Sequence, residues 1–204
     1  MKKALLLLLP LALMLMHTVT GYSQTLLGTY TFGLCPETNT VTAQPANGLF
    51  TAITRTVVAS SCVSGFFRSD GWNNDATVYD LTRYITFTLT ANAGFTTNFT
   101  TSDYVTFIAK TLVDSGTVDK IRVDYSLDGA AYVTMGELDI NTAFAAKTFY
   151  FPSNIQSAVT GNIQFRIYAK GIALSGSQRL VNMDNVSLYG AICSGSPGIT
   201  GSAI

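Results

Sequence analysis

The sequence predicts an all-β protein, a two-sheet antiparallel β-sandwich of about eight to ten strands. Short segments rich in β-branched and aromatic residues alternate apolar and polar side chains, and turn residues separate them at short intervals. A helical period is confined to the short stretch Asn154 to Val159. With 204 residues, the chain has room for one domain with a sizeable core.

The first half of the chain contains four expected strand regions. They are residues 28–32, residues 49–58, a strand end within 64–74, and residues 84–90. In the last of these, Ile85, Phe87 and Leu89 share one side, whereas a tyrosine and three threonines share the other. One buried and one solvated face is typical of an antiparallel sheet.

The second half repeats this alternation. Expected strands cover residues 104–109, 121–127, 131–135, 149–151 and 163–170. Asp128 and Gly129 predict a tight turn that joins the second and third of these strands in a hairpin.

The last expected strand runs from Arg179 to Gly190. Side chains in a strand alternate between its two faces, so the even-numbered positions of this strand share one face. They are Leu180, Asn182, Asp184, Val186 and Leu188. A carboxylate on a largely apolar face is costly without a partner. We therefore expect Asp184 to anchor a neighbouring loop, to bind a metal, or to lie at a β-bulge.

The first 23 residues have the pattern of a signal peptide. Lys2 and Lys3 precede an apolar stretch from Ala4 to Met16, and small residues lie near Ser23, where we expect cleavage. The apolar stretch is shorter than the roughly 20 residues that cross a bilayer. We therefore expect a secreted or cell-surface protein without a membrane segment after cleavage.

Charge and histidine content exclude several functions. The chain has 12 basic and 12 acidic residues, and the basic residues are scattered, so a nucleic-acid partner is not expected. His17 is the only histidine and lies in the leader. Without it, the mature chain lacks the usual Ser-His-Asp and Cys-His nucleophilic sites and any metal site built on imidazole.

The three cysteines leave two pairings open. Cys35 and Cys62 lie in turn-rich stretches, and we favour a disulfide between them. The alternative pairs Cys35 with Cys193, because the first and last strands of sandwiches often neighbour each other. Residues 193–204 have the composition of a linker-like tail, so in the favoured pairing Cys193 is an odd thiol.

Five segments occur in an order that carries a resemblance to a known family. They are TYTF (29–32), FFRSDGW (66–72), YITFTLTANAGF (84–95), DYSLDGAAY (124–132) and MDNVSLYG (183–190). Over residues 25–192 the chain resembles jelly-roll modules of secreted proteins from gliding-type bacteria, which are commonly cargo of the type IX secretion system. The resemblance implies a non-catalytic jelly roll over 24–192 and a following module in a longer chain.

Similar jelly rolls often bind carbohydrate, which implies a polysaccharide or surface glycan as partner. An aromatic ring beside amides and carboxylates suits a sugar, which has an apolar face and a rim of hydroxyls. The alternative is that the tryptophan of this set fills the sandwich edge. Tyr84, on the solvated face of its strand, is either a second stacking platform or ordinary surface. The candidate ligand residues are Trp72, Asp70, Asn73, Asn74 and Tyr79.

No cofactor is expected, with structural calcium as the one alternative. Asp184 is the candidate calcium ligand, although no run of closely spaced carboxylates accompanies it. The competing interpretation is a carboxylate that caps loop amides.

Three functions remain from the sequence. We expect a non-catalytic carbohydrate-binding or adhesive module, with a structural spacer domain as the alternative. A polysaccharide hydrolase or lyase is disfavoured because Glu37 and Glu137 lie in unrelated stretches and Tyr168 and Lys170 have no accompanying histidine. An enzyme would have to use the aspartates Asp70, Asp75, Asp80 and Asp184.

Overall fold

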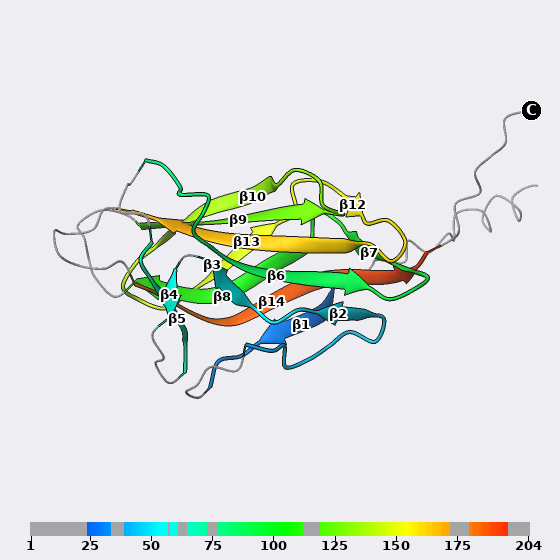
Figure 1. The fold of residues 1–204 in the computed structure, drawn as a ribbon, viewed down its shortest axis with the longest axis horizontal. Coiled ribbons are helices and arrows are strands. Elements are labelled where there is room, and N and C mark those ends of the chain that lie inside the picture. Colours follow the sequence, from blue (N-terminus) through cyan, green and yellow to red (C-terminus); the bar gives the residue numbers. More distant parts are fainter. Residues whose placement is uncertain are drawn as a thin grey trace, which may run out of the picture.

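The fold is a β-sandwich in the computed structural model, which describes residues 24–33, 39–56, 58–60, 65–72, 77–111, 119–171 and 180–195. Every regular element within these ranges is a strand, and the strands form two antiparallel sheets. The predicted fold class is confirmed. Figure 1 shows the long strands running side by side along the longest axis of the molecule.

The first sheet has eight strands. Its main order is β11 (Ala145–Tyr150), β8 (Tyr104–Thr111), β14 (Val181–Ser194), β5 (Phe67–Asp70) and β4 (Ala59–Ser60). Along β14 it also takes in β1 (Thr25–Tyr30) and β7 (Phe95–Phe99), and β7 pairs with β12 (Ile155–Gln156).

The second sheet has six strands. Its order is β10 (Val133–Ile140), β9 (Asp119–Leu127), β13 (Asn162–Lys170), β6 (Tyr84–Ala91) and β2 (Gly48–Phe50), with β3 (Thr54–Thr56) also paired to β6. The predicted hairpin at Asp128 and Gly129 is confirmed, because β9 and β10 are antiparallel neighbours on either side of it.

The core lies between the two sheets and is rich in phenylalanine. On β6, Ile85, Phe87 and Leu89 are buried, as the alternation predicted. Phe87 stacks on Phe165 of β13, with ring centroids 4.9 Å apart. Because one face of each central strand fills this core, its other face is directed away from the sandwich interior.

A β-bulge in β14 corrects the predicted face of the last strand. The register with β8 shifts between Asp184 and Ser187, and Asn185 adopts a φ of 53°. Val181 and Met183 are buried before the bulge, and Val186 and Leu188 are buried after it. The expected common face was therefore wrong, since the extra residue moves Asn182 and Asp184 to the side opposite Val186 and Leu188.

Asp184 fulfils two of its three expected roles. Its Oδ1 accepts hydrogen bonds from the backbone N–H of Asn185, at 2.8 Å, and of Phe32, at 3.3 Å. It thus lies at the bulge and anchors the segment that follows β1. Among the described residues, no group of three or more His, Cys, Asp or Glu side chains could hold a metal ion. Calcium binding at Asp184 stays an untested alternative to the expected absence of a cofactor.

The carboxyl-terminal boundary also differs from the expectation. Strand β14 continues to Ser194, and Cys193 pairs with Thr96 of β7 rather than opening the tail. Cys193 is a half-buried free thiol. The signal peptide, Cys35, Cys62 and residues 196–204 lie outside the described residues, so these expectations stay predictions. In the described part of the chain, no helix has the length and apolar character needed to cross a membrane.

Candidate functional site

The structure separates the residues that the sequence grouped around Trp72. Trp72 is 3% exposed and belongs to the core, where its Nε1 donates a hydrogen bond to the carbonyl of Ser69. It therefore fills the sandwich and offers no exposed stacking face. Asp70 is half-buried at the end of β5, and Asn73 and Asn74 lie outside the described residues.

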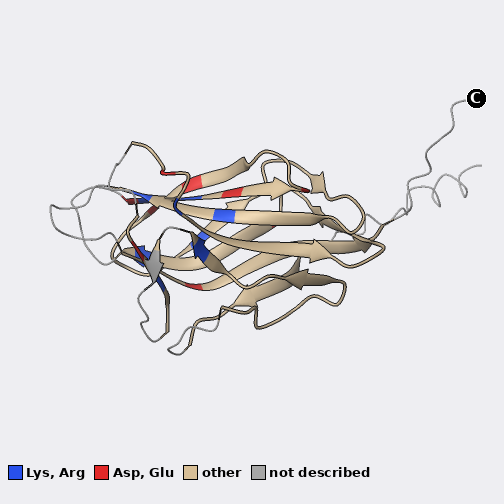
Figure 2. Cartoon of the chain, in the orientation of Figure 1, with Lys and Arg blue, Asp and Glu red and all other residues tan. Residues whose placement is uncertain are grey.

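Tyr79 packs on a different part of the molecule, the outer face of the six-stranded sheet. We call this surface the arginine face. Its residues come from β6, β9 and β13, which are adjacent in the sheet, and from the segments before β6 and before β10. Figure 2 shows acidic and basic residues on the strands of this sheet. The arginine face consists of Tyr79, Tyr84, Arg122, Asp124, Tyr132, Gln164, Arg166 and Tyr168.

Strand alternation explains why these side chains share one face. On β13, Ile163, Phe165 and Ile167 point into the core, so the intervening glutamine, arginine and tyrosine point outward. The register then places Arg166 opposite Asp124 of β9 on one side and Thr86 of β6 on the other.

The two arginines lie against tyrosine rings. The guanidinium carbon of Arg166 is 4.0 Å from the ring centroid of Tyr132 and 4.1 Å from that of Tyr84. Arg122 lies 4.8 Å from the ring centroid of Tyr79 and 5.0 Å from that of Tyr168. Such cation–π contacts each contribute about 0.5 to 2 kcal/mol and hold the guanidinium groups in place.

Hydrogen bonds connect the polar groups of the arginine face. Arg122 Nη2 donates to Asp124 Oδ2 at 2.6 Å, and the Tyr132 hydroxyl donates to Gln164 Oε1. Burial raises the pKa of Tyr132 and of Tyr168 above the ordinary value. Their hydroxyls therefore stay protonated at neutral pH and can donate hydrogen bonds.

A cluster of charges borders this face. Lys120 bridges to Glu137 at 3.3 Å and to Asp139 at 2.8 Å, and Lys170 reaches Glu137 at 3.3 Å. Partial burial tends to raise the pKa of Glu137, but hydrogen bonds from Tyr79, Lys170 and Lys120 outweigh it and lower the pKa. Glu137 is thus a carboxylate at neutral pH, whereas the general acid of a glycosidase needs a raised pKa.

Several polar groups of the arginine face retain unused bonding capacity. Within the described residues, Nε of Arg122, Nε of Arg166 and Oδ1 of Asp124 are buried and have no hydrogen-bond partner. Arg166 also forms no ion pair with a carboxylate of the described chain, unlike Lys120, Lys170 and Arg122. Buried polar atoms are normally paired, so this network is incomplete without a ligand or water.

Sequence reasoning had singled out only part of this face. Tyr84 and Tyr168 were noted separately, and the structure places their ring centroids 5.9 Å apart. The alternation expected over residues 121–127 and 163–170 also puts Arg122, Asp124 and Arg166 opposite the apolar side chains of their strands. The missing information was the order β9, β13, β6, which brings those outward positions together.

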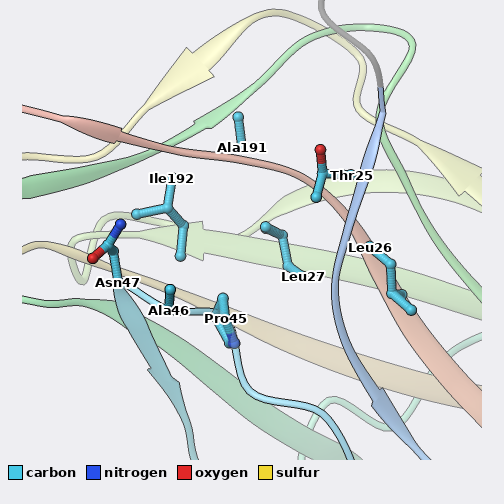
Figure 3. Close-up of a pocket in the computed structure, with 8 residues that line it drawn as sticks. All are labelled: Thr25, Leu26, Leu27, Pro45, Ala46, Asn47, Ala191 and Ile192. Atoms are coloured by element: carbon cyan, nitrogen blue, oxygen red, sulfur yellow. The ribbon is translucent and has the colours of Figure 1, made fainter.

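A separate hollow lies near the amino-terminal end of β1. Its volume is about 350 Å³, and β1, the segment before β2 and the end of β14 form its walls (Figure 3). The lining residues are Thr25, Leu26, Leu27, Pro45, Ala46, Asn47, Ala191 and Ile192. None of these eight carries a charge, so the hollow has fewer groups to orient a polar ligand than the arginine face.

Comparisons with known proteins concern the fold. No protein-family model matches the sequence, and no curated protein sequence is similar to it. The chain is similar in fold to solved structures of carbohydrate-binding modules at low identity. A family 29 variant has 10% identity and a TM-score of 0.41, over 82% of this chain and 91% of that one. A family 4 module has 11% identity and a TM-score of 0.40, over 67% and 79%. A family 61 module in complex with β-1,4-galactotriose has 14% identity and a TM-score of 0.34, over 72% and 90%.

Proposed function

We propose that the protein is a non-catalytic carbohydrate-binding module, and that its arginine face binds a polysaccharide or surface glycan. The observation that carries the proposal is Arg166. Its guanidinium lies against the rings of Tyr84 and Tyr132, without a carboxylate partner in the described chain. A cation kept in place on aromatic rings, without a carboxylate partner, is suited to bind the hydroxyls of a sugar.

The chemistry of a sugar matches the groups around Arg166. A pyranose has an apolar face that packs on tyrosine rings and hydroxyls that both donate and accept hydrogen bonds. Arg166 supplies donors, Gln164 supplies an amide, and Tyr132 supplies a hydroxyl on an adjacent position of the same surface. Together they provide two half-buried tyrosine rings beside a guanidinium group and several directed hydrogen bonds.

The same residues argue against catalysis on this face. Asp124 and Glu137 each bond to a cation, and the hydrogen bonds to Glu137 lower its pKa, whereas a general acid needs a raised one. We therefore propose binding without bond cleavage, by an exported protein that needs no cofactor. The leader sequence supports export.

The experiment is a glycan-array screen of the purified protein, followed by calorimetry on each ligand found. Arg166→Gln removes the guanidinium and should weaken binding about 10- to 100-fold, because hydrogen bonds from a charged group contribute about 1.5 to 3 kcal/mol. Lys110→Gln is the matched control. Lys110 lies 4.4 Å from the ring centroid of Phe144 and belongs to β8 of the other sheet.

The outcomes separate the candidate functions. Weakened binding by a folded Arg166→Gln variant, with unchanged binding by Lys110→Gln, supports the proposal. Equal affinity of the Arg166→Gln variant and the wild type would overturn it. If no glycan binds, the spacer function is favoured instead. Repeating the titration with a calcium chelator tests Asp184, and we expect no change.

A further inference from the structure

The outer face of the eight-stranded sheet carries a row of three tyrosine rings, of which Tyr150 is exposed and Tyr104 and Tyr189 are half-buried. Tyr150 of β11 is directly opposite Tyr104 of β8, Tyr189 of β14 follows, and Leu26 of β1 is opposite Tyr189. The ring centroid of Tyr104 lies 5.4 Å from that of Tyr150 and 4.5 Å from that of Tyr189. We call these four residues the tyrosine stripe. Tyr150 is 53% exposed and Leu26 is 44% exposed.

A row of hydroxyl groups runs beside the tyrosine stripe on the same four strands. Thr148 and Thr106 are cross-strand partners with their hydroxyl oxygens 3.1 Å apart, and Ser187 and Thr29 are partners with theirs 2.9 Å apart. Thr106 is in turn opposite Ser187. Each hydroxyl has one donor and two acceptor positions, so the three threonine hydroxyls retain capacity for further hydrogen bonds. Ser187 is buried, and its hydroxyl also donates to the carbonyl of Asn185.

The two rows together favour a neutral saccharide as the occupant. Aromatic rings beside a line of hydroxyls complement a polymer that presents apolar ring faces and a hydroxyl rim. Neither row contains a charged side chain, so an ionic partner has nothing to pair with there. A sugar chain therefore fits this surface better than a charged ligand.

The dimensions of the stripe also favour a polymer chain over a protein. Neighbouring strands are about 4.8 Å apart, so a row across four strands is about 14 Å long. A stable protein interface buries about 800 Å² on each partner. The four side chains, of which Tyr150 is the most exposed at 53%, offer on the order of 300 Å².

We propose that the tyrosine stripe is a second saccharide-binding surface, and that it binds a neutral polysaccharide chain. Because the arginine face belongs to the other sheet, the two surfaces point away from each other. One protein molecule then bridges two polysaccharide chains. This bridging rests on the proposed function of the arginine face, whereas binding at the stripe does not.

The test uses beads coated with one of three neutral polysaccharides, namely galactan, mannan or cellulose, and the full-length protein as a monomer. Wild-type protein should agglutinate the beads. Tyr104→Thr combined with Tyr150→Thr should abolish agglutination while binding to a single bead surface persists through the arginine face. Threonine keeps strand propensity high, so these variants should fold. Val159→Thr is the control, since Val159 is 47% exposed and lies outside both surfaces.

The possible results distinguish this proposal from the proposed function. Unchanged agglutination by the doubly substituted variant would overturn the tyrosine stripe alone. So would a wild-type protein that binds beads without agglutinating them. A wild-type dimer that Tyr150→Thr converts to a monomer would show that a second copy occupies the stripe. Absence of any binding by the wild type would overturn both proposals.

Discussion

The buried carboxylate of Asp124 stabilises the arginine face, to which it belongs. Its side chain is 4% exposed and pairs with Arg122 at 2.6 Å. Removing one member of a buried ion pair leaves an uncompensated charge, which costs about 3 to 5 kcal/mol. We therefore expect Asp124→Asn to lower the free energy of unfolding by about 3 kcal/mol, measured by urea denaturation.

A matched control exists on the neighbouring strand. Asp139 pairs with Lys120 at 2.8 Å, but its side chain is 64% exposed. Exposed ion pairs contribute about 0 to 1 kcal/mol, so Asp139→Asn should have little effect on unfolding. Equal urea midpoints for Asp124→Asn and the wild type would contradict the structural role assigned to Asp124.

Single residues also show which properties of the site the sequence predicted and which it did not. Trp72 has the right chemistry for a sugar platform, but composition does not reveal that its ring is buried. Tyr79 was grouped with Trp72 because the two are close in sequence, whereas its contacts are with Arg122 and Tyr168. Side-chain type predicted the kind of site, and pairing between distant strands determined its location.

At the scale of the element, the bulge in β14 is the most specific local feature. Asn185 has a φ of 53°, a left-handed conformation that asparagine and glycine tolerate and β-branched residues do not. Such strain costs about 1 to 3 kcal/mol. We expect Asn185→Val to destabilise the protein by about 2 kcal/mol, and Asn185→Gly by much less, as measured by thermal unfolding.

Equal destabilisation by both Asn185 substitutions would contradict the backbone argument. It would indicate instead that loss of the asparagine side chain matters. The backbone N–H of residue 185 still donates to Asp184 in either variant, so the anchor between Asp184 and Phe32 is retained.

The strands themselves were largely predictable, and the bulge was not. The alternation that predicted strands over residues 84–90, 104–109, 121–127 and 163–170 coincides with β6, β8, β9 and β13, because each of these strands runs for eight or nine residues without interruption. In β14 the same rule failed, because one extra residue lies between Asp184 and Ser187. The side chains after this bulge therefore point to the side of the sheet opposite to the one that alternation predicts. The order of strands within each sheet depends on contacts between distant segments, which alternation does not encode.

At the scale of the whole molecule, tyrosines occur in the core and on both outer faces. Tyr30 packs against Phe87 in the core, with ring centroids 5.4 Å apart. Tyr168 belongs to the arginine face and Tyr104 to the tyrosine stripe. Burial is the largest cause that raises the pKa of five tyrosines above the ordinary value. They are Tyr30, Tyr79, Tyr104, Tyr132 and Tyr168.

These raised pKa values predict a loss of stability in alkaline solution. In the unfolded chain the tyrosines ionise near pH 10, whereas the folded chain retains their protons to higher pH. The unfolded state then binds fewer protons than the folded state, so the free energy of unfolding falls as pH rises above about 10. Below that pH, both states hold the protons and this contribution is constant.

Urea denaturation at a series of pH values from neutral to strongly alkaline measures the effect, and tyrosinate absorbance reports ionisation directly. Replacing Tyr168 by phenylalanine removes one such group and should make the fall in stability shallower. Phenylalanine is chosen because it keeps the ring that contacts Arg122 on the arginine face. Only the hydroxyl is removed. The sequence has ten tyrosines, so the comparison is with the urea-unfolded chain. Tyrosinate absorbance near pH 10 that is as large in the folded protein as in the unfolded chain would contradict the prediction, since it would mean that burial does not hold the protons of these five tyrosines.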